Sequence, residues 1–185
     1  MMLTDYYLTI VGAILYKRRY GQHIHFETYE MNPQWQRSVS EQKWFEPRHL
    51  IRVLISSVVI VALGESDMSE DSQWIGFLFG LFIGLYLPII GRHLTNILMF
   101  WDAIRHPEQI SGEARIGHAF ALRMSQYYAV PVALLLLVLA LLTNTSVVWG
   151  ACAGQLLLVF IHFGWSNRYR KQIKKAQPPS SSSSI

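Results

Sequence analysis

Four polar side chains near the ends of two long apolar segments are the residues best placed for chemistry. Arg92, His93 and Asn96 close the apolar segment that begins at Trp74, and His162 precedes the end of the last apolar segment. Ionisable groups inside membrane helices are functional candidates because they face a partner or a cavity rather than lipid. We therefore predict a polar inner cluster of these four residues. The competing explanation is that side chains near a helix end simply extend toward water.

Two of these residues also suggest a cofactor. His93 and His162 come from different apolar segments and are expected at a similar depth, and a pair of imidazoles is an arrangement that holds a haem iron. This pattern favours a haem-ligating or metal-ligating redox subunit as one functional class. No cofactor is predicted outright, and an absorption spectrum separates this class from the others.

A second polar group alternates with apolar residues over 22–30, which is the period of a β-strand. His23, His25 and Glu27 would then share one face, and imidazole and carboxylate both ligate zinc. Their spacing differs from that of the common closed zinc sites. The polar side of a strand resting on helices is therefore the competing interpretation.

A third pair is Asp102 and His106, four residues apart on one helical face. A carboxylate bonded to an imidazole fixes its tautomer and raises its basicity, as a general base requires. This pair underlies a third class, a membrane enzyme acting on lipid head groups, although a surface pair at this spacing needs no function. No nucleophile elbow, phosphate loop or metalloprotease signature is present.

The elements that must position these residues are long apolar helices. The chain has 185 residues, 51% of them hydrophobic and only 15% charged, and the apolar residues occur in blocks. This predicts an all-α, polytopic membrane bundle, one transmembrane domain over 1–175 with a small cytoplasmic face. Four spans are expected, over 47–63, 74–101, 127–142 and 147–165. The run over 3–16 is either a short fifth span or a helix in the interface.

The central span carries a stripe of small residues. Gly76, Gly80 and Gly84 recur every four residues, and Gly150 and Gly154 offer a similar face on the last span. Such stripes let helix backbones approach closely in lipid, where no hydrophobic effect drives association. The stripe predicts a helix–helix interface, either within one chain or between copies. Glycine is also common in membrane helices without any packing role, which is the alternative.

Charge distribution predicts the orientation. Basic residues follow Tyr16 and Trp101 and fill the tail 167–175, whereas the loop over 64–73 is acidic. The positive-inside rule places the loops after Tyr16 and Trp101 and the C-terminus in the cytoplasm, and the loop 64–73 outside. The basic tail is typical of an inner-leaflet anchor rather than a nucleic-acid site. Residues 176–185, rich in Pro and Ser, are expected to be disordered.

Between the second and third spans we expect an amphipathic helix that starts near Ser111 and leads into the span 127–142. Taken together, the patterns favour a non-enzymatic membrane protein whose partners are membrane lipid and other copies or subunits. A homo-oligomeric pore or a subunit of a membrane complex, assembled through the glycine stripe, is the leading functional hypothesis. The redox subunit and the head-group enzyme are the alternatives.

Overall fold

The computed structural model describes residues 1–66 and 73–176, and within them the chain is mostly helical. The elements follow in the order α1 (Met2–Arg18), η1 (Tyr20–Gln22), β1 (Ile24–Phe26), α2 (Gln36–Ser40), α3 (Pro47–Ser66), α4 (Gln73–Arg105), η2 (Pro107–Gln109), β2 (Ala114–Ile116), α5 (His118–Thr143) and α6 (Ser146–Ala176). Part of the predicted outer loop, 67–72, and the predicted disordered tail from 177 lie outside the described residues.

Three of the helices, α4, α5 and α6, are long and apolar enough to cross a membrane. This agrees with the membrane class expected from the sequence. The fourth span, on α3, and the fifth, on α1, remain predictions. α1 has 17 residues and runs alongside the second half of α4 in the same direction, with Asp5 near His93 and Gly12 near Ile97.

The glycines of α4 lie against α6 of the same chain. A methyl group on Gly80 would overlap the carbonyl oxygen of Val147, and one on Gly84 would overlap that of Ala151. The relation is mutual, because a methyl group on Gly150 or Gly154 would overlap the backbone of α4. Close backbone approach of this kind requires glycine on both helices.

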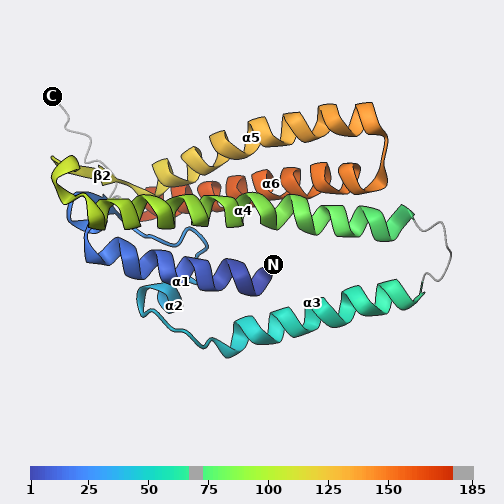
Figure 1. The fold of residues 1–185 in the computed structure, drawn as a ribbon, viewed down its shortest axis with the longest axis horizontal. Coiled ribbons are helices and arrows are strands. Elements are labelled where there is room, and N and C mark those ends of the chain that lie inside the picture. Colours follow the sequence, from blue (N-terminus) through green and yellow to red (C-terminus); the bar gives the residue numbers. More distant parts are fainter. Residues whose placement is uncertain (67–72, 177–185) are drawn as a thin grey trace, which may run out of the picture.

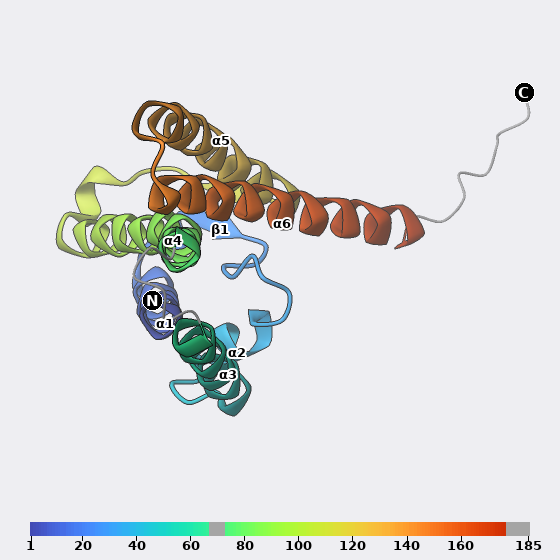
Figure 2. The same cartoon turned by 90° about the vertical axis from the view of Figure 1, so that its right-hand side faces the viewer.

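Seen end on, the helices form a curved row in the order α5, α6, α4, α1 and α3 (Figure 2). α3 stands apart from α4 along most of its length (Figure 1). The segment between β1 and α2 lies on the concave side of the row. There Tyr6, Ile10 and Ala13 of α1 bury Val39, with Trp35 packed against them. This small core fixes the position of the segment 29–39.

The region before α5 differs from the expectation. The helix starts at His118, not near Ser111, and it continues through Pro131 as a single element to Thr143. Residues Ala114–Ile116 instead form β2, which pairs in parallel with β1. The backbone N–H and C=O groups of Ala114–Ile116 therefore bond to β1, about 90 residues earlier in the chain. The local pattern of apolar residues does not reveal such a distant partner. α6 likewise continues through the basic tail as far as Ala176.

Candidate functional site

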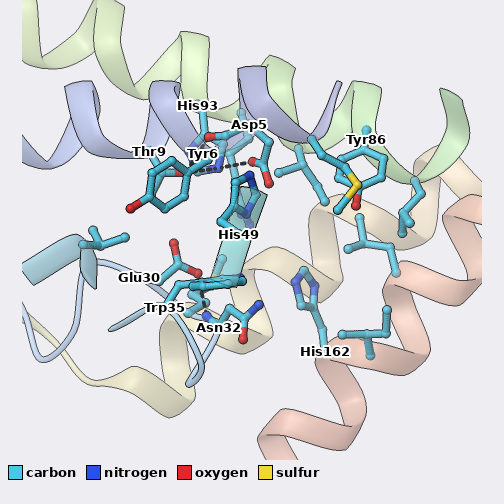
Figure 3. A pocket seen from close by; sticks show the side chains of 18 of the residues that line it. Asp5, Tyr6, Thr9, Glu30, Asn32, Trp35, His49, Tyr86, His93 and His162 are labelled. Atoms are coloured by element: carbon cyan, nitrogen blue, oxygen red, sulfur yellow. Dashed lines mark hydrogen bonds and ion pairs between the residues drawn. The ribbon is translucent and has the colours of Figure 1, made fainter. Parts of the chain in front are cut away.

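A cavity of about 240 Å³ lies where α1, α3, α4 and α6 meet the segment 30–39 (Figure 3). We call it the polar cavity. Its lining combines two carboxylates, two arginines, three histidines and several aromatic rings. The lining residues with polar or aromatic side chains include Asp5, Tyr6, Thr9, Glu30, Asn32, Trp35, His49, Arg52, Tyr86, Arg92, His93, His162 and Trp165.

His93 is held in the cavity wall by α1. Its Nε2 lies 3.2 Å from the Thr9 hydroxyl and 3.1 Å from Asp5 Oδ1. Thr9 donates its only proton to the Asp5 carbonyl oxygen at 2.9 Å, so it accepts from His93 and the Nε2 nitrogen must carry a proton. The other nitrogen, Nδ1, is buried and has no partner among the described residues. In the neutral ring it is a hydrogen-bond acceptor.

Arg92 takes part in a hydrogen-bond network that connects α4, α5 and α6. Its Nη1 donates to Ser125 Oγ of α5 at 2.6 Å, and the same oxygen lies 3.2 Å from Nδ1 of His162 on α6. A guanidinium can only donate, so Ser125 accepts from Arg92 and its own proton is free to reach His162. His162 is only 3% exposed. The network fixes the orientation of Arg92 at the cavity wall.

Glu30 enters the cavity from a tight turn. Its Oε1 accepts from the Asn32 amide at 2.6 Å, and Asn32 Oδ1 accepts from the Gln34 amide at 3.1 Å. An Asn side chain that bonds two residues on is a recognised way to reverse the chain before Pro33. Burial raises the pKa of the Glu30 carboxyl, and this outweighs the amide hydrogen bond, which favours the charged form.

Aromatic rings at the cavity already have stacking partners. The His49 ring stacks on Tyr6 with centroids 4.6 Å apart, and the Arg52 guanidinium lies 4.8 Å from the centre of the Trp35 ring. Arg52 also donates to Gln34 at 2.6 Å. Both ring nitrogens of His49 are buried without a partner among the described residues. The first turns of α3 thereby close the cavity beside α1.

The segment that carries Glu30 is fastened to the ends of α5 and α6. Glu27 accepts from the His118 backbone amide at 2.9 Å and from the Tyr169 hydroxyl at 2.6 Å. Thr28 Oγ1 lies 2.7 Å from His118 Nδ1. These bonds lower the pKa of Glu27, the backbone bond from His118 being the main cause, because both donors favour the charged carboxylate.

An apolar groove of about 330 Å³ lies between α4 and α5, on the other side of Arg92. We call it the lateral groove. It shares Glu30, Met31, Arg92 and His93 with the polar cavity. Its rim residues Thr95, Met99, Met124 and Tyr128 are exposed on the surface that α4 and α5 turn outward. From these shared residues the lateral groove leads toward Met99 and Phe100, near the end of α4.

A third cavity, of about 440 Å³, lies between α1, α3 and α4. It is lined mainly by apolar side chains and adjoins the polar cavity through Met2 and Tyr86. Neither shared side chain carries a formal charge. This space therefore lacks the charged boundary that Arg92 gives to the lateral groove.

The structure brings together part of the predicted inner cluster. Arg92, His93 and His162 all line the polar cavity, whereas Asn96 lines the lateral groove. Over residues 1–66 and 73–176, no group of three or more histidine, cysteine or acidic side chains is arranged to hold a metal ion. The haem interpretation of His93 and His162 stays a prediction.

The other predicted groups lie elsewhere. His23 donates to the Gly112 carbonyl at 3.1 Å and His25 is exposed, while Glu27 is engaged by α5 and α6 as described. Asp102 and His106 approach to 4.0 Å, but both are exposed and lie beyond the polar cavity. Neither set forms an enclosed site.

Sequence reasoning missed several lining residues, among them Asp5, Glu30, Trp35, His49 and Ser125. The local sequence could have indicated a role for Asp5, because a carboxylate inside an apolar helical run needs a partner. It gives no such indication for Glu30, since an acidic residue before a turn is ordinarily solvated. Comparison with protein-family models, with curated proteins and with solved structures found no match to this chain.

Proposed function

We propose that this chain is an integral membrane protein that binds a phospholipid, with the head group in the polar cavity and its phosphate at Arg92, where the lateral groove begins. The observation that supports this most directly is that Arg92 lines both spaces. A guanidinium is well suited to phosphate because its planar array of donors matches the phosphate oxygens. At the boundary of a polar and an apolar space it would meet the phosphate of an amphiphile.

The depth of Arg92 supports the same proposal. At 1.5 Å per residue, Arg92 lies about 27 Å along α4 from Trp74. The hydrocarbon core of a bilayer is about 30 Å thick, so the guanidinium would lie near one boundary of that core. Phospholipid phosphates lie just outside this boundary. The lateral groove runs from Arg92 toward Met99 and Phe100 on α4 and the first turns of α5, so it lies on the head-group side of this boundary.

We infer that the cavity end faces the cytoplasm. α1 ends in Lys17 and Arg18, α4 ends in Arg105, and α6 continues into a basic stretch. These three helix ends lie at the same end of the bundle (Figure 1). By the positive-inside rule that end is cytoplasmic, and the bound lipid would come from the inner leaflet.

We also infer that α3 is a fourth span and that α1 is not a fifth. α3 has 20 residues, about 30 Å of helix, and its apolar side chains from Ile51 to Val61 are exposed on several sides. Lipid is the environment that suits such a surface. α1 instead lies beside the cytoplasmic half of α4, where its polar residues complete the cavity.

The other hypotheses have less geometric support. An oligomeric pore built on the glycine stripe would need that face at a subunit boundary, and here α6 of the same chain fills it. A head-group enzyme using Asp102 and His106 would need an enclosed pair, and both side chains are exposed. A haem site would give a Soret band that is lost in His162→Ala, a result that would replace the lipid proposal.

The test is the lipid that the protein carries through purification. Protein extracted in mild detergent is delipidated by washing, then organic solvent extracts the remaining lipid for quantification by mass spectrometry. Wild type should retain about one phospholipid per chain, and Arg92→Gln several-fold less. Arg105→Gln is the matched control, because Arg105 lies on the same helix but stacks on exposed Trp101.

A second variant separates loss of lipid binding from loss of folding. Met124→Trp places a large ring at the exposed rim of the lateral groove without touching the bonds between Arg92, Ser125 and His162. It should lower retention while the melting temperature stays near that of wild type. Equal retention in wild type, Arg92→Gln and Met124→Trp would refute the proposal, as would wild type that carries no phospholipid.

A further inference from the structure

The polar cavity holds several buried polar atoms without a hydrogen-bond partner among the described residues, and at least three of them are acceptors: Asp5 Oδ1, His93 Nδ1 and one ring nitrogen of the neutral His49. His93 Nδ1 and both ring nitrogens of His49 have no partner among the described residues, and each of these histidines is 7% exposed. Asp5 Oδ1 is also buried and has no hydrogen-bond partner among the described residues, although His93 Nε2 lies 3.1 Å away. Buried acceptors without donors are uncommon in folded proteins and call for a partner.

Among the described residues, neither carboxylate of the cavity forms an ion pair with a lysine or arginine, and the one imidazole close to them is His93, 3.1 Å from Asp5 Oδ1. The ion pairs that lysine and arginine form within the described part of the chain are Arg37–Glu41 and Lys43–Glu41, on the surface. The two arginines of the cavity have other partners. Arg52 donates a hydrogen bond to Gln34 and lies over the Trp35 ring, and Arg92 donates a hydrogen bond to Ser125. Asp5 and Glu30 therefore face the cavity without a lysine or arginine ion pair.

We propose that the head group bound in the polar cavity carries a primary ammonium group. This rests on the proposed function and adds the class of lipid, an amine-bearing phospholipid of the ethanolamine or serine type. A primary ammonium brings a positive charge and three N–H donors, which match Asp5, Glu30 and the histidine acceptors. The phosphate on the same head group would pair with Arg92.

A quaternary ammonium fits this cavity poorly. It carries no N–H, so Asp5, His49 and His93 would stay unpaired. Proteins that recognise quaternary ammonium do so with free aromatic faces. Here the Tyr6 ring is stacked by His49 and the Trp35 ring is covered by Arg52. The geometry therefore separates two zwitterionic head groups that differ only in methylation.

The test compares phospholipids with identical acyl chains and different head groups. Delipidated protein is reconstituted with equimolar ethanolamine, choline and glycerol phospholipids, and the retained species are quantified. We expect the ethanolamine lipid to exceed the choline lipid by at least about tenfold, because sites built around hydrogen bonds to N–H groups reject analogues that lack them. Equal retention of ethanolamine and choline lipids, or a preference for the glycerol lipid, would overturn the inference.

Two variants connect the preference to the cavity. Glu30→Gln should reduce the ethanolamine preference to a few-fold while phospholipid binding through Arg92 persists. Asp102→Asn, a change at an exposed carboxylate on α4, is the control and should leave the preference intact. Full preference in Glu30→Gln and in the double variant with Asp5→Asn would overturn the assignment of the ammonium to these carboxylates.

Water-soluble competitors distinguish a membrane lipid from a free head group. Glycerophosphoethanolamine should displace bound lipid at millimolar concentration, and glycerophosphocholine should not; equal displacement by both would overturn the inference. Displacement at micromolar concentration would support amine recognition and identify a soluble ligand as its source. Retention of no phospholipid at all would refute the proposed function, whereas retention without amine preference would refute this inference alone.

Discussion

The contact between α4 and α6 gives the sharpest test of the fold, through Gly80→Ala. A methyl group there would overlap the Val147 carbonyl oxygen and would lie 2.7 Å from the carbonyl carbon, about 0.7 Å closer than an ordinary contact. The neighbours are backbone atoms, so no side chain can rotate away. The two helices must therefore move apart, and the contacts of the other glycines on the same face would weaken as well.

The magnitude follows from two opposing terms. Overpacking of this kind typically costs about 1–3 kcal/mol. Alanine regains up to about 1 kcal/mol over glycine through its helix propensity. We therefore expect a net loss of about 1–2 kcal/mol for Gly80→Ala. For a chain of this length this corresponds to a drop in Tm of roughly 2–8 °C.

Gly91→Ala is the matched control, because it makes the same change on the same helix where nothing lies within 4 Å. It should leave the Tm unchanged or raise it slightly. The assay is thermal unfolding in detergent, followed by intrinsic fluorescence of the tryptophans, together with size-exclusion chromatography. If Gly80→Ala melts with or above Gly91→Ala, α4 and α6 are not in contact through this face.

Three further predictions concern the site and its orientation. Thr9→Val removes the acceptor for His93 Nε2 and should lower the free energy of unfolding by about 1–3 kcal/mol. The same change at Thr95, on the exposed side of α4, should alter it little. Equal melting temperatures of the two variants would contradict the His93 contact. Glu27 has a lowered pKa, so its bonds to His118 and Tyr169 stabilise the fold above the ordinary glutamate pKa of 4.5 and are lost at lower pH. The Tm difference between wild type and Glu27→Gln should therefore be full at neutral pH and shrink in acid, and a difference that is independent of pH would exclude this linkage. A cysteine in place of Glu65 should react with an impermeant thiol reagent outside intact cells and one in place of Lys171 should not, with the reverse result inverting the proposed orientation.

The membrane class and the places of the long helices could be predicted from the sequence. Apolar runs such as the one after Trp74 identify membrane helices by length alone, because hydrocarbon accepts only segments that satisfy their own backbone. The expected starts of α3 at Pro47 and of α4 near Trp74 agree with the helices found. Their ends were less predictable: α4 continues to Arg105 and α6 through the basic tail, since charged residues past the membrane boundary are as compatible with helix as with loop.

The membership of the polar cavity could not be predicted in this way. Asp5, Glu30 and His49 come from three separate segments, and nothing in their local sequence says that they meet His93 and His162. Their meeting depends on long-range contacts: the pairing of β1 with β2, the bonds of Glu27 to two helix ends, and the burial of Val39 against α1. The sequence by itself determined which helices suit a membrane, because hydropathy and periodicity are local properties. Only the tertiary structure decided which polar groups share one cavity, because that depends on how distant segments pack.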